Sequence, residues 1–136
     1  MTTVVWDGRT LAADRRMAGH MTTCKIFPID GGYVAGAGTM DQLVEVAAWL
    51  QEGGDKPRLP DDPESEFIVV RGSEAFWLSW PYLREVRIRE PFAALGSGAE
   101  YALGALAMGA DARTAVEVAA QFDPHTGGGV DAVDTA

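Results

Sequence analysis

The pair Met1-Thr2 offers the most distinctive chemistry in this 136-residue sequence. If Met1 is removed, Thr2 becomes the first residue and carries a hydroxyl nucleophile and a free α-amine within one residue. An α-amine has an ordinary pKa of about 7.7–8.0, so a useful fraction is unprotonated near neutral pH and can accept the hydroxyl proton. Because many chains begin this way without consequence, the pair alone predicts no activity.

The other residues that could carry chemistry favour structural roles. His20 and His125 are the only histidines, and no Cys or carboxylate stands at metal-ligand spacing around them, so we expect no metal. Leu95 stands where a nucleophile elbow around Ser97 would require a glycine, and Ser97 stands where a helix pattern begins, so taken alone Ser97 is expected to cap that helix. Cys24 stands beside apolar residues in a strand pattern and is expected to be a buried, unreactive thiol.

Composition narrows the class of protein. The chain is 47% apolar and has a formal net charge of -9, which favours one globular domain over residues 1–136 and opposes binding to nucleic acid or to an anionic membrane. The segments Gly36-Ala37-Gly38 and Gly96-Ser97-Gly98 each lack the third glycine of a dinucleotide fingerprint, so no nucleotide cofactor is expected. No secretory signal or membrane span is recognisable, which predicts a cytoplasmic protein.

The hydrophobic patterns predict an α+β fold. Alternating apolar runs around Asp-Gly and Gly-rich turns predict three hairpins, and Pro28 predicts an edge position for its strand. Helical spacing with capping residues predicts three helices, and the segment from Asp55 to Pro63 is expected to be a surface loop. The hairpins are expected at 3–6 with 10–13, 24–29 with 33–36, and 66–70 with 75–80, and the helices at 39–53, 97–109 and 111–122.

Six short segments, in this order and at these intervals, resemble the proteasome β-subunit and HslV peptidase family of N-terminal nucleophile hydrolases. The similarity spans nearly the whole chain, and each segment alone is common. The segments are Met1-Thr2-Thr3-Val4-Val5, Ala12-Ala13-Asp14-Arg15-Arg16, Lys25-Ile26, Ala35-Gly36-Ala37-Gly38, Gly96-Ser97-Gly98 and Asp123-Pro124-His125-Thr126-Gly127-Gly128.

The resemblance implies a role for each matching residue. Thr2 matches the nucleophile, and Asp14 and Lys25 match the acidic and basic residues beneath it. A buried ammonium stabilises a developing alkoxide, and a carboxylate offsets the cost of burying that ammonium. The residues that match those positioning the α-amine and its water are Ser97, Asp123 and Thr126, and Gly36 and Gly38 are both candidates for the oxyanion-hole donor.

The same resemblance implies an αββα four-layer sandwich, no cofactor, and a threonine-type peptidase that cleaves proteins or peptides inside a closed homo-oligomeric ring. Small residues such as Ala102, Gly104 and Ala105 would permit close helix packing in that ring. Because the 55–63 segment cannot form the family's second helix, one outer layer is expected to be reduced, which argues against docking of an ATPase unfoldase. The alternatives are a catalytically inactive structural or binding subunit and an amidase for small molecules.

Overall fold

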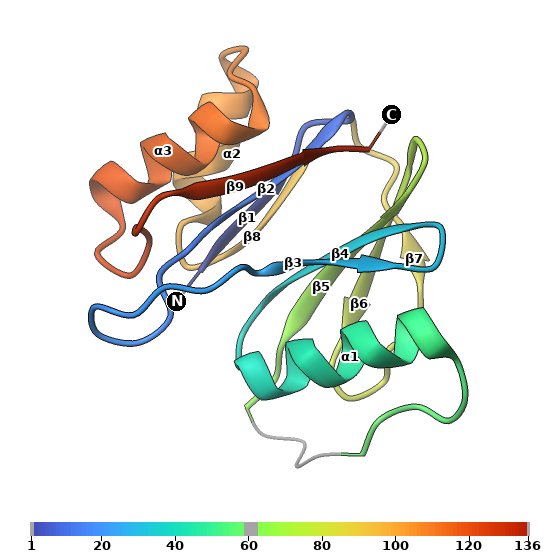
Figure 1. The fold of residues 1–136 in the computed structure, drawn as a ribbon. Helices are drawn as coiled ribbons and strands as arrows, with labels where there is room; N and C mark the ends of the chain where they lie inside the picture. Colours follow the sequence, from blue (N-terminus) through green and yellow to red (C-terminus); the bar gives the residue numbers. More distant parts are fainter. Residues whose placement is uncertain (1, 59–62, 136) are drawn as a thin grey trace.

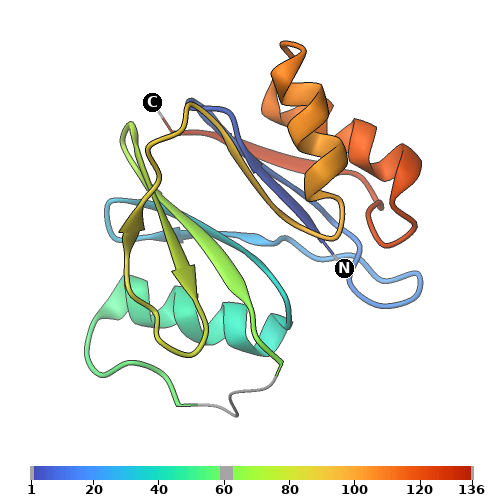
Figure 2. The ribbon, with the colours of Figure 1, turned by 180° about the vertical axis from the view of Figure 1, so that it is seen from behind.

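The computed structural model describes residues 2–58 and 63–135, in which two antiparallel sheets lie face to face between helices (Figures 1 and 2). One sheet has the strand order β8-β1-β2-β9 and the other β3-β4-β5-β6-β7. The elements are β1 (Thr3–Trp6), β2 (Thr10–Asp14), β3 (Ile26–Ile29), β4 (Gly32–Ala37), α1 (Met40–Glu52), β5 (Glu66–Arg71), β6 (Glu74–Ser79), β7 (Val86–Arg87), β8 (Ala93–Gly96), α2 (Ala99–Ala107), α3 (Ala112–Phe122) and β9 (Val130–Asp134).

Three apolar layers hold the sandwich together. The first lies between α1 and the five-stranded sheet around Phe67 and Leu78, and the second lies between the two sheets around Leu11 and Ile68. The third joins the four-stranded sheet to α2 and α3 and consists largely of alanine and valine. Figure 1 shows α1 alone on one outer face and the α2–α3 pair on the other. The expected αββα sandwich with one outer layer reduced is therefore confirmed.

The hairpins follow local turn chemistry. Asp7 Oδ1 accepts hydrogen bonds from the N–H groups of Arg9 and Thr10, and Gly8 at φ +96° completes the turn between β1 and β2. Val4 of β1 then pairs with Ala13 of β2. Pro28 lies in β3, which is the edge strand that its missing N–H predicts.

One strand has no clear signal in the sequence. β8 consists of Ala93-Ala94-Leu95-Gly96, whose alanines and glycine have little intrinsic preference for strands. It forms because it pairs antiparallel with β1, with Thr3 opposite Gly96. Tertiary pairing thus adds β8 as the edge strand of the four-stranded sheet, beside the strand that follows Thr2.

The connection after α1 agrees with the expected loop as far as it is described. Residues 55–58 and 63 have neither helical nor strand conformation, and the remainder of the expected 55–63 loop lies outside the described residues. Within the described ranges, no helix is both long and apolar enough to cross a membrane.

Two details of the helices correct the sequence-based expectations. The α2 helix has Gly98 as its N-cap, and no side chain caps it, so Ser97 is not the expected cap. Ala102 of α2 is fully buried against the four-stranded sheet and is not free to contact another subunit. Gly104 is exposed and Ala105 half-buried.

Asp111 caps α3 by accepting the Thr114 N–H at 2.8 Å, and these hydrogen bonds lower the pKa of its carboxyl group. We expect Asp111→Ala to lower the free energy of unfolding by about 1 kcal/mol at neutral pH. Because the folded pKa lies below the ordinary value of 3.8, the Asp111 contribution is complete well above that value and is lost as pH falls through the folded pKa.

Denaturant unfolding at a fixed protein concentration measures this difference, with Glu117→Ala on an exposed face of α3 as the matched control. An Asp111→Ala variant as stable as the control at pH 7 would contradict the cap.

Candidate active site

Thr2 lies at the head of β1, which is held in the middle of its sheet between β8 and β2. Thr2 is only 4% exposed. Gly96, at φ +97°, lets the end of β8 approach closely, because a Cβ at this position would lie 1.9 Å from the Thr2 carbonyl oxygen. Thr2 is therefore enclosed on several sides.

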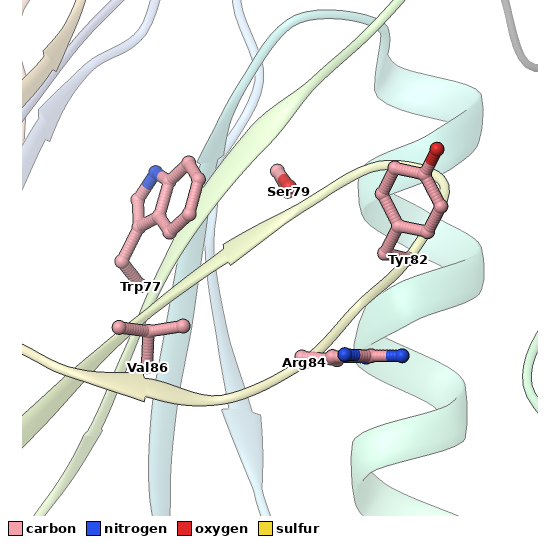
Figure 3. A pocket seen from close by; sticks show the side chains of 5 residues that line it. All are labelled: Trp77, Ser79, Tyr82, Arg84 and Val86. Carbon is pink, nitrogen blue, oxygen red and sulfur yellow. The ribbon is translucent and has the colours of Figure 1, made fainter.

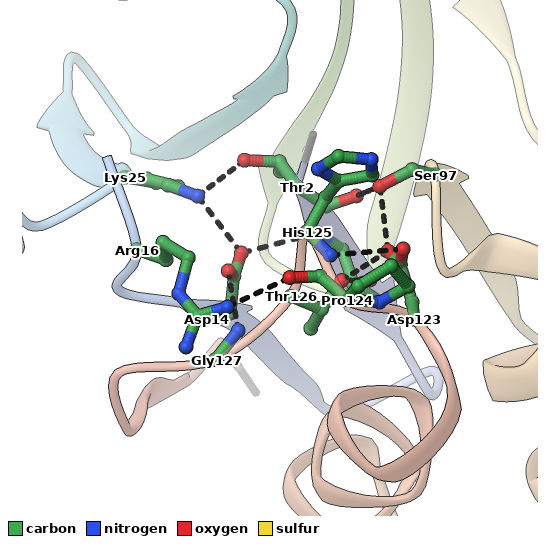
Figure 4. A network of polar contacts seen from close by, with 11 residues as sticks. Thr2, Asp14, Arg16, Lys25, Ser97, Asp123, Pro124, His125, Thr126 and Gly127 are labelled. Atoms are coloured by element: carbon green, nitrogen blue, oxygen red, sulfur yellow. Dashed lines mark hydrogen bonds and ion pairs between the residues drawn. The ribbon is translucent and has the colours of Figure 1, made fainter. Parts of the chain in front are cut away.

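Lys25 and Asp14 meet beside the Thr2 side chain. The Lys25 Nζ donates hydrogen bonds to Thr2 Oγ1 and to Asp14 Oδ1, the latter at 2.9 Å (Figure 4). Lys25 is 3% exposed and Asp14 is fully buried. Asp14 ends β2 of one sheet and Lys25 precedes β3 of the other, so this ion pair joins the two sheets.

The chain between these two residues brings them together. Thr23 N–H donates to the Arg15 carbonyl oxygen at 2.8 Å, and Arg16 and Thr22 form an isolated antiparallel bridge. The segment 15–24 is therefore a hairpin-like excursion whose two ends carry Asp14 and Lys25.

Asp14 accepts three hydrogen bonds. Its Oδ1 accepts the Thr3 N–H at 3.1 Å in addition to Lys25, and its Oδ2 accepts the Gly127 N–H at 3.1 Å. Three donors from three segments stabilise this buried carboxylate. Asp14 therefore remains a suitable counter-ion for Lys25.

The pKa of Lys25 is lowered. Burial of the ammonium is the largest cause, and the hydrogen bond and charge of Asp14 oppose it. An ammonium with a lowered pKa is a stronger proton donor toward Thr2 Oγ1, so it can stabilise negative charge that develops on this oxygen.

A second polar network lies on the other side of Thr2. Asp123 Oδ2 accepts the Ser97 hydroxyl at 2.6 Å and the Thr126 hydroxyl at 2.5 Å, and its Oδ1 accepts the His125 N–H at 3.1 Å. The Ser97 Oγ also lies 3.5 Å from the Thr2 carbonyl oxygen. This network occupies the main-chain side of Thr2, opposite Lys25 (Figure 4).

Asp123 is held in its ionised form. Burial raises the pKa of its carboxyl group, but the hydrogen bonds from Ser97, Thr126 and the His125 N–H more than offset this, and the net pKa is lowered. The carboxylate therefore fixes both hydroxyl groups as donors near neutral pH.

Two residues not assigned from the sequence complete the site. The Thr3 Oγ1 lies 2.8 Å from Thr126 Oγ1 and links β1 to the Asp123 network. Arg16 donates to the Pro124 carbonyl oxygen at 2.7 Å and so holds the loop after α3 against the end of β2. Their nearness to Thr2 and Asp14 in the sequence is the only signal that indicates them.

The two candidate oxyanion glycines lie in different environments. Gly36 is inside β4, and a Cβ there would meet Phe67 and Leu43 in the apolar layer under α1. Gly38 lies beyond the end of β4 at φ +138°, and its N–H has no hydrogen-bond partner among the described residues. Both border a small pocket that contains Thr2, Lys25 and the apolar side chains of Met17, Met40 and Leu43.

The remaining candidate residues lie elsewhere. Cys24 is exposed and its thiol donates to the Ile26 carbonyl oxygen, so the expectation of a buried thiol in a strand is wrong. A separate pocket on β6 and β7 contains none of the Thr2 network, and Trp77, Tyr82 and Val86 line it with Ser79 and Arg84 (Figure 3). Within residues 2–58 and 63–135, no cluster of three His, Cys, Asp or Glu side chains could hold a metal ion.

Comparison with known proteins places this geometry in a known fold. No family model matches the sequence, and no curated protein matches it. Thiobacillus denitrificans BPH in complex with epoxomicin has a TM-score of 0.73 and 22% identity, covering 98% of this chain and 96% of that chain. HslV from Trypanosoma brucei has a TM-score of 0.66 and 20% identity, covering 98% of this chain and 97% of that chain. The chain therefore shares its αββα fold with BPH and HslV.

Proposed function

We propose that this protein is a threonine-type peptidase in which removal of Met1 makes Thr2 the nucleophile. The observation that carries the proposal is the Thr2 hydroxyl group, hydrogen-bonded to a buried Lys25 ammonium that Asp14 balances. A hydroxyl at this position can become an alkoxide at lower cost, because the neighbouring cation is already in place.

Each step uses a group of this site. The free α-amine of Thr2 takes the proton of Oγ1 while this oxygen attacks the carbonyl carbon of the scissile peptide bond. The carbonyl oxygen becomes negatively charged, and we assign to it the N–H of Gly38, which has no partner within residues 2–58 and 63–135. When the C–N bond breaks, the α-ammonium returns the proton to the leaving amine, and an ester remains on Thr2.

Water completes the cycle. The α-amine removes a proton from a water molecule that attacks the ester carbon. The ester C–O bond then breaks, the α-ammonium returns the proton to Oγ1, and the carboxylic acid leaves. We assign Ser97, Asp123 and Thr126 to holding the amine and this water, since Ser97 Oγ lies 3.5 Å from the Thr2 carbonyl oxygen and Asp123 accepts the hydroxyl groups of both Ser97 and Thr126.

Because we assign both the nucleophilic hydroxyl and the basic α-amine to Thr2, the first prediction concerns this residue. Protein that begins at Thr2 should cleave unfolded protein substrates and react at Thr2 with a peptide boronate, with a β-lactone, and with epoxomicin, which the BPH neighbour binds. Thr2→Ala should lose labelling and cleavage together, and Thr2→Ser should keep part of both. An uncleavable N-terminal extension should be as inactive as Thr2→Ala, because it blocks the amine.

Intact mass and peptide mapping locate the label, and Thr10→Ala, at the far end of β2, is the matched control that should label normally. If assembled protein with Thr2 first neither labels nor cleaves, a shell-only structural subunit becomes the better account. If it cleaves only small amides, the amidase is the better account.

The Lys25–Asp14 pair sets the second prediction. Lys25→Ala should abolish cleavage while the protein remains assembled, and Asp14→Asn should do nearly the same because it leaves an ammonium without a counter-ion. Asp14→Asn should also cost about 3–5 kcal/mol of stability at pH 7. Asp131→Asn, which breaks the exposed Arg15–Asp131 pair, is the matched control and should change stability far less.

The sign of the pH dependence follows from the lowered pKa of Lys25. The unfolded chain binds this proton up to its ordinary pKa of 10.5 while the folded chain releases it earlier, so folding stability attributable to Lys25 rises with pH across that interval. Asp14→Asn removes an opposing cause and should widen the interval, so this variant should regain more stability than wild type as the pH rises toward 10.5. Thermal unfolding across this range tests the difference in stability. For the activity prediction, full cleavage activity in Lys25→Ala or Asp14→Asn would place the site elsewhere.

Ring assembly sets the third prediction. The outer helices expose Met108 at 89%, Phe122 at 60% and Tyr101 at 46%, and the Tyr101 and Phe122 rings stack 5.5 Å apart. Such apolar exposure on one layer is typical of a protein contact surface. Light scattering at micromolar concentration should give a multiple of the 14.5 kDa protomer mass, whereas a lone 14.5 kDa species would overturn the ring.

A further inference from the structure

Ser65 lies directly against the candidate oxyanion glycine, although nothing in its type or place in the sequence suggests a role. It immediately precedes β5 and is 1% exposed. A Cβ on Gly38 would lie 2.0 Å from Ser65 Oγ and 2.8 Å from Ser65 Cα. Only glycine allows these two segments to approach so closely, and Ser65 therefore limits where Gly38 can lie.

A chain of hydrogen bonds fixes the peptide unit that follows Gly38. The Thr39 N–H donates to Ser65 Oγ at 3.1 Å, and the Ser65 hydroxyl group donates to Gln42 Oε1. Gln42 Nε2 donates in turn to the Pro63 carbonyl oxygen at 2.7 Å. Because each group donates to the next, the chain polarises Ser65 Oγ and makes it a better acceptor for Thr39.

This arrangement bears on the Gly38 N–H. The contact with Ser65 restrains the Cα of Gly38, and the bond to Thr39 N–H restrains the plane of the next peptide group. With both restrained, the direction of the Gly38 N–H depends only on rotation about the two backbone bonds at its Cα, of which φ is +138°. An oxyanion donor is effective only when it is aimed before charge develops.

We propose that Ser65 is a positioning residue that aims the Gly38 N–H at the oxyanion. This inference rests on the proposed peptidase function and on Gly38 as the donor. Ser65 touches neither the nucleophile nor the substrate carbonyl in this account, so its effect passes through the Gly38–Thr39 backbone.

Ser65→Ala tests the proposal in the assembled protein with Thr2 first. Active sites are counted by intact mass after exhaustive reaction with a peptide β-lactone, and kcat is expressed per labelled site. We expect kcat per site to fall about 10- to 100-fold while KM changes by less than about threefold. Ser65→Thr retains the hydroxyl group and should keep more activity than Ser65→Ala, and Ser79→Ala, which borders the same groove as Ser65, should match wild type.

A merely structural role gives a different result, because fewer sites would label while each labelled site kept its wild-type kcat. That outcome, or a kcat per site within about threefold of wild type, overturns the inference. If Ser65→Ala does not assemble, Gln42→Met replaces it, since it removes the acceptor for the Ser65 hydroxyl, and the same thresholds apply. Inactive wild-type protein would refute the peptidase itself, whereas active wild type with unaffected variants refutes only the role of Ser65.

Discussion

The burial of the Lys25 ammonium is the constraint on which the rest of the site depends. An unpaired charge at this depth would cost several kcal/mol, so Asp14 must lie beside it as a carboxylate. Asp14 in turn needs donors for its other acceptor positions, and the N–H groups of Thr3 and Gly127 supply them. One buried charge thus requires the start of β1, the end of β2, the start of β3 and the loop after α3 to converge.

The two buried carboxylates of the site have different surroundings and different consequences. Asp14 faces an ammonium and two backbone N–H groups, whereas Asp123 is surrounded by the hydroxyl groups of Ser97 and Thr126 and one backbone N–H. The first therefore compensates a charge next to the Thr2 side chain. The second orients neutral hydroxyl groups beside the Thr2 main chain, which makes the two sides of Thr2 chemically distinct.

Glycines decide how closely these segments approach. Gly96 touches the Thr2 carbonyl group, and Gly38 touches Ser65. Gly98, at the start of α2, would place a Cβ 2.1 Å from Thr3 Oγ1 and 3.1 Å from Thr126 Oγ1. The absence of a side chain at all three positions lets strand ends and a helix start pack around Thr2 without displacing its hydrogen bonds.

The sequence by itself determined most of the local elements, whereas the layer order was expected from the resemblance to known peptidases. Turn residues, capping residues and hydrophobic periodicity indicate the hairpins and helices, because these features depend on neighbours within a few positions. The resemblance to known peptidases then indicated Thr2, Asp14 and Lys25, and the structure brings all three together.

Only the tertiary structure decided what depends on distant partners. β8 forms through pairing with β1 rather than through its own propensity, and Ser97 gives its hydroxyl group to Asp123 rather than to the helix it precedes. Cys24 is exposed, and Ser65 contacts Gly38 across 27 positions of sequence. Local patterns cannot encode these outcomes, because the competing hydrogen bonds and contacts are offered by segments that meet only when the two sheets pack.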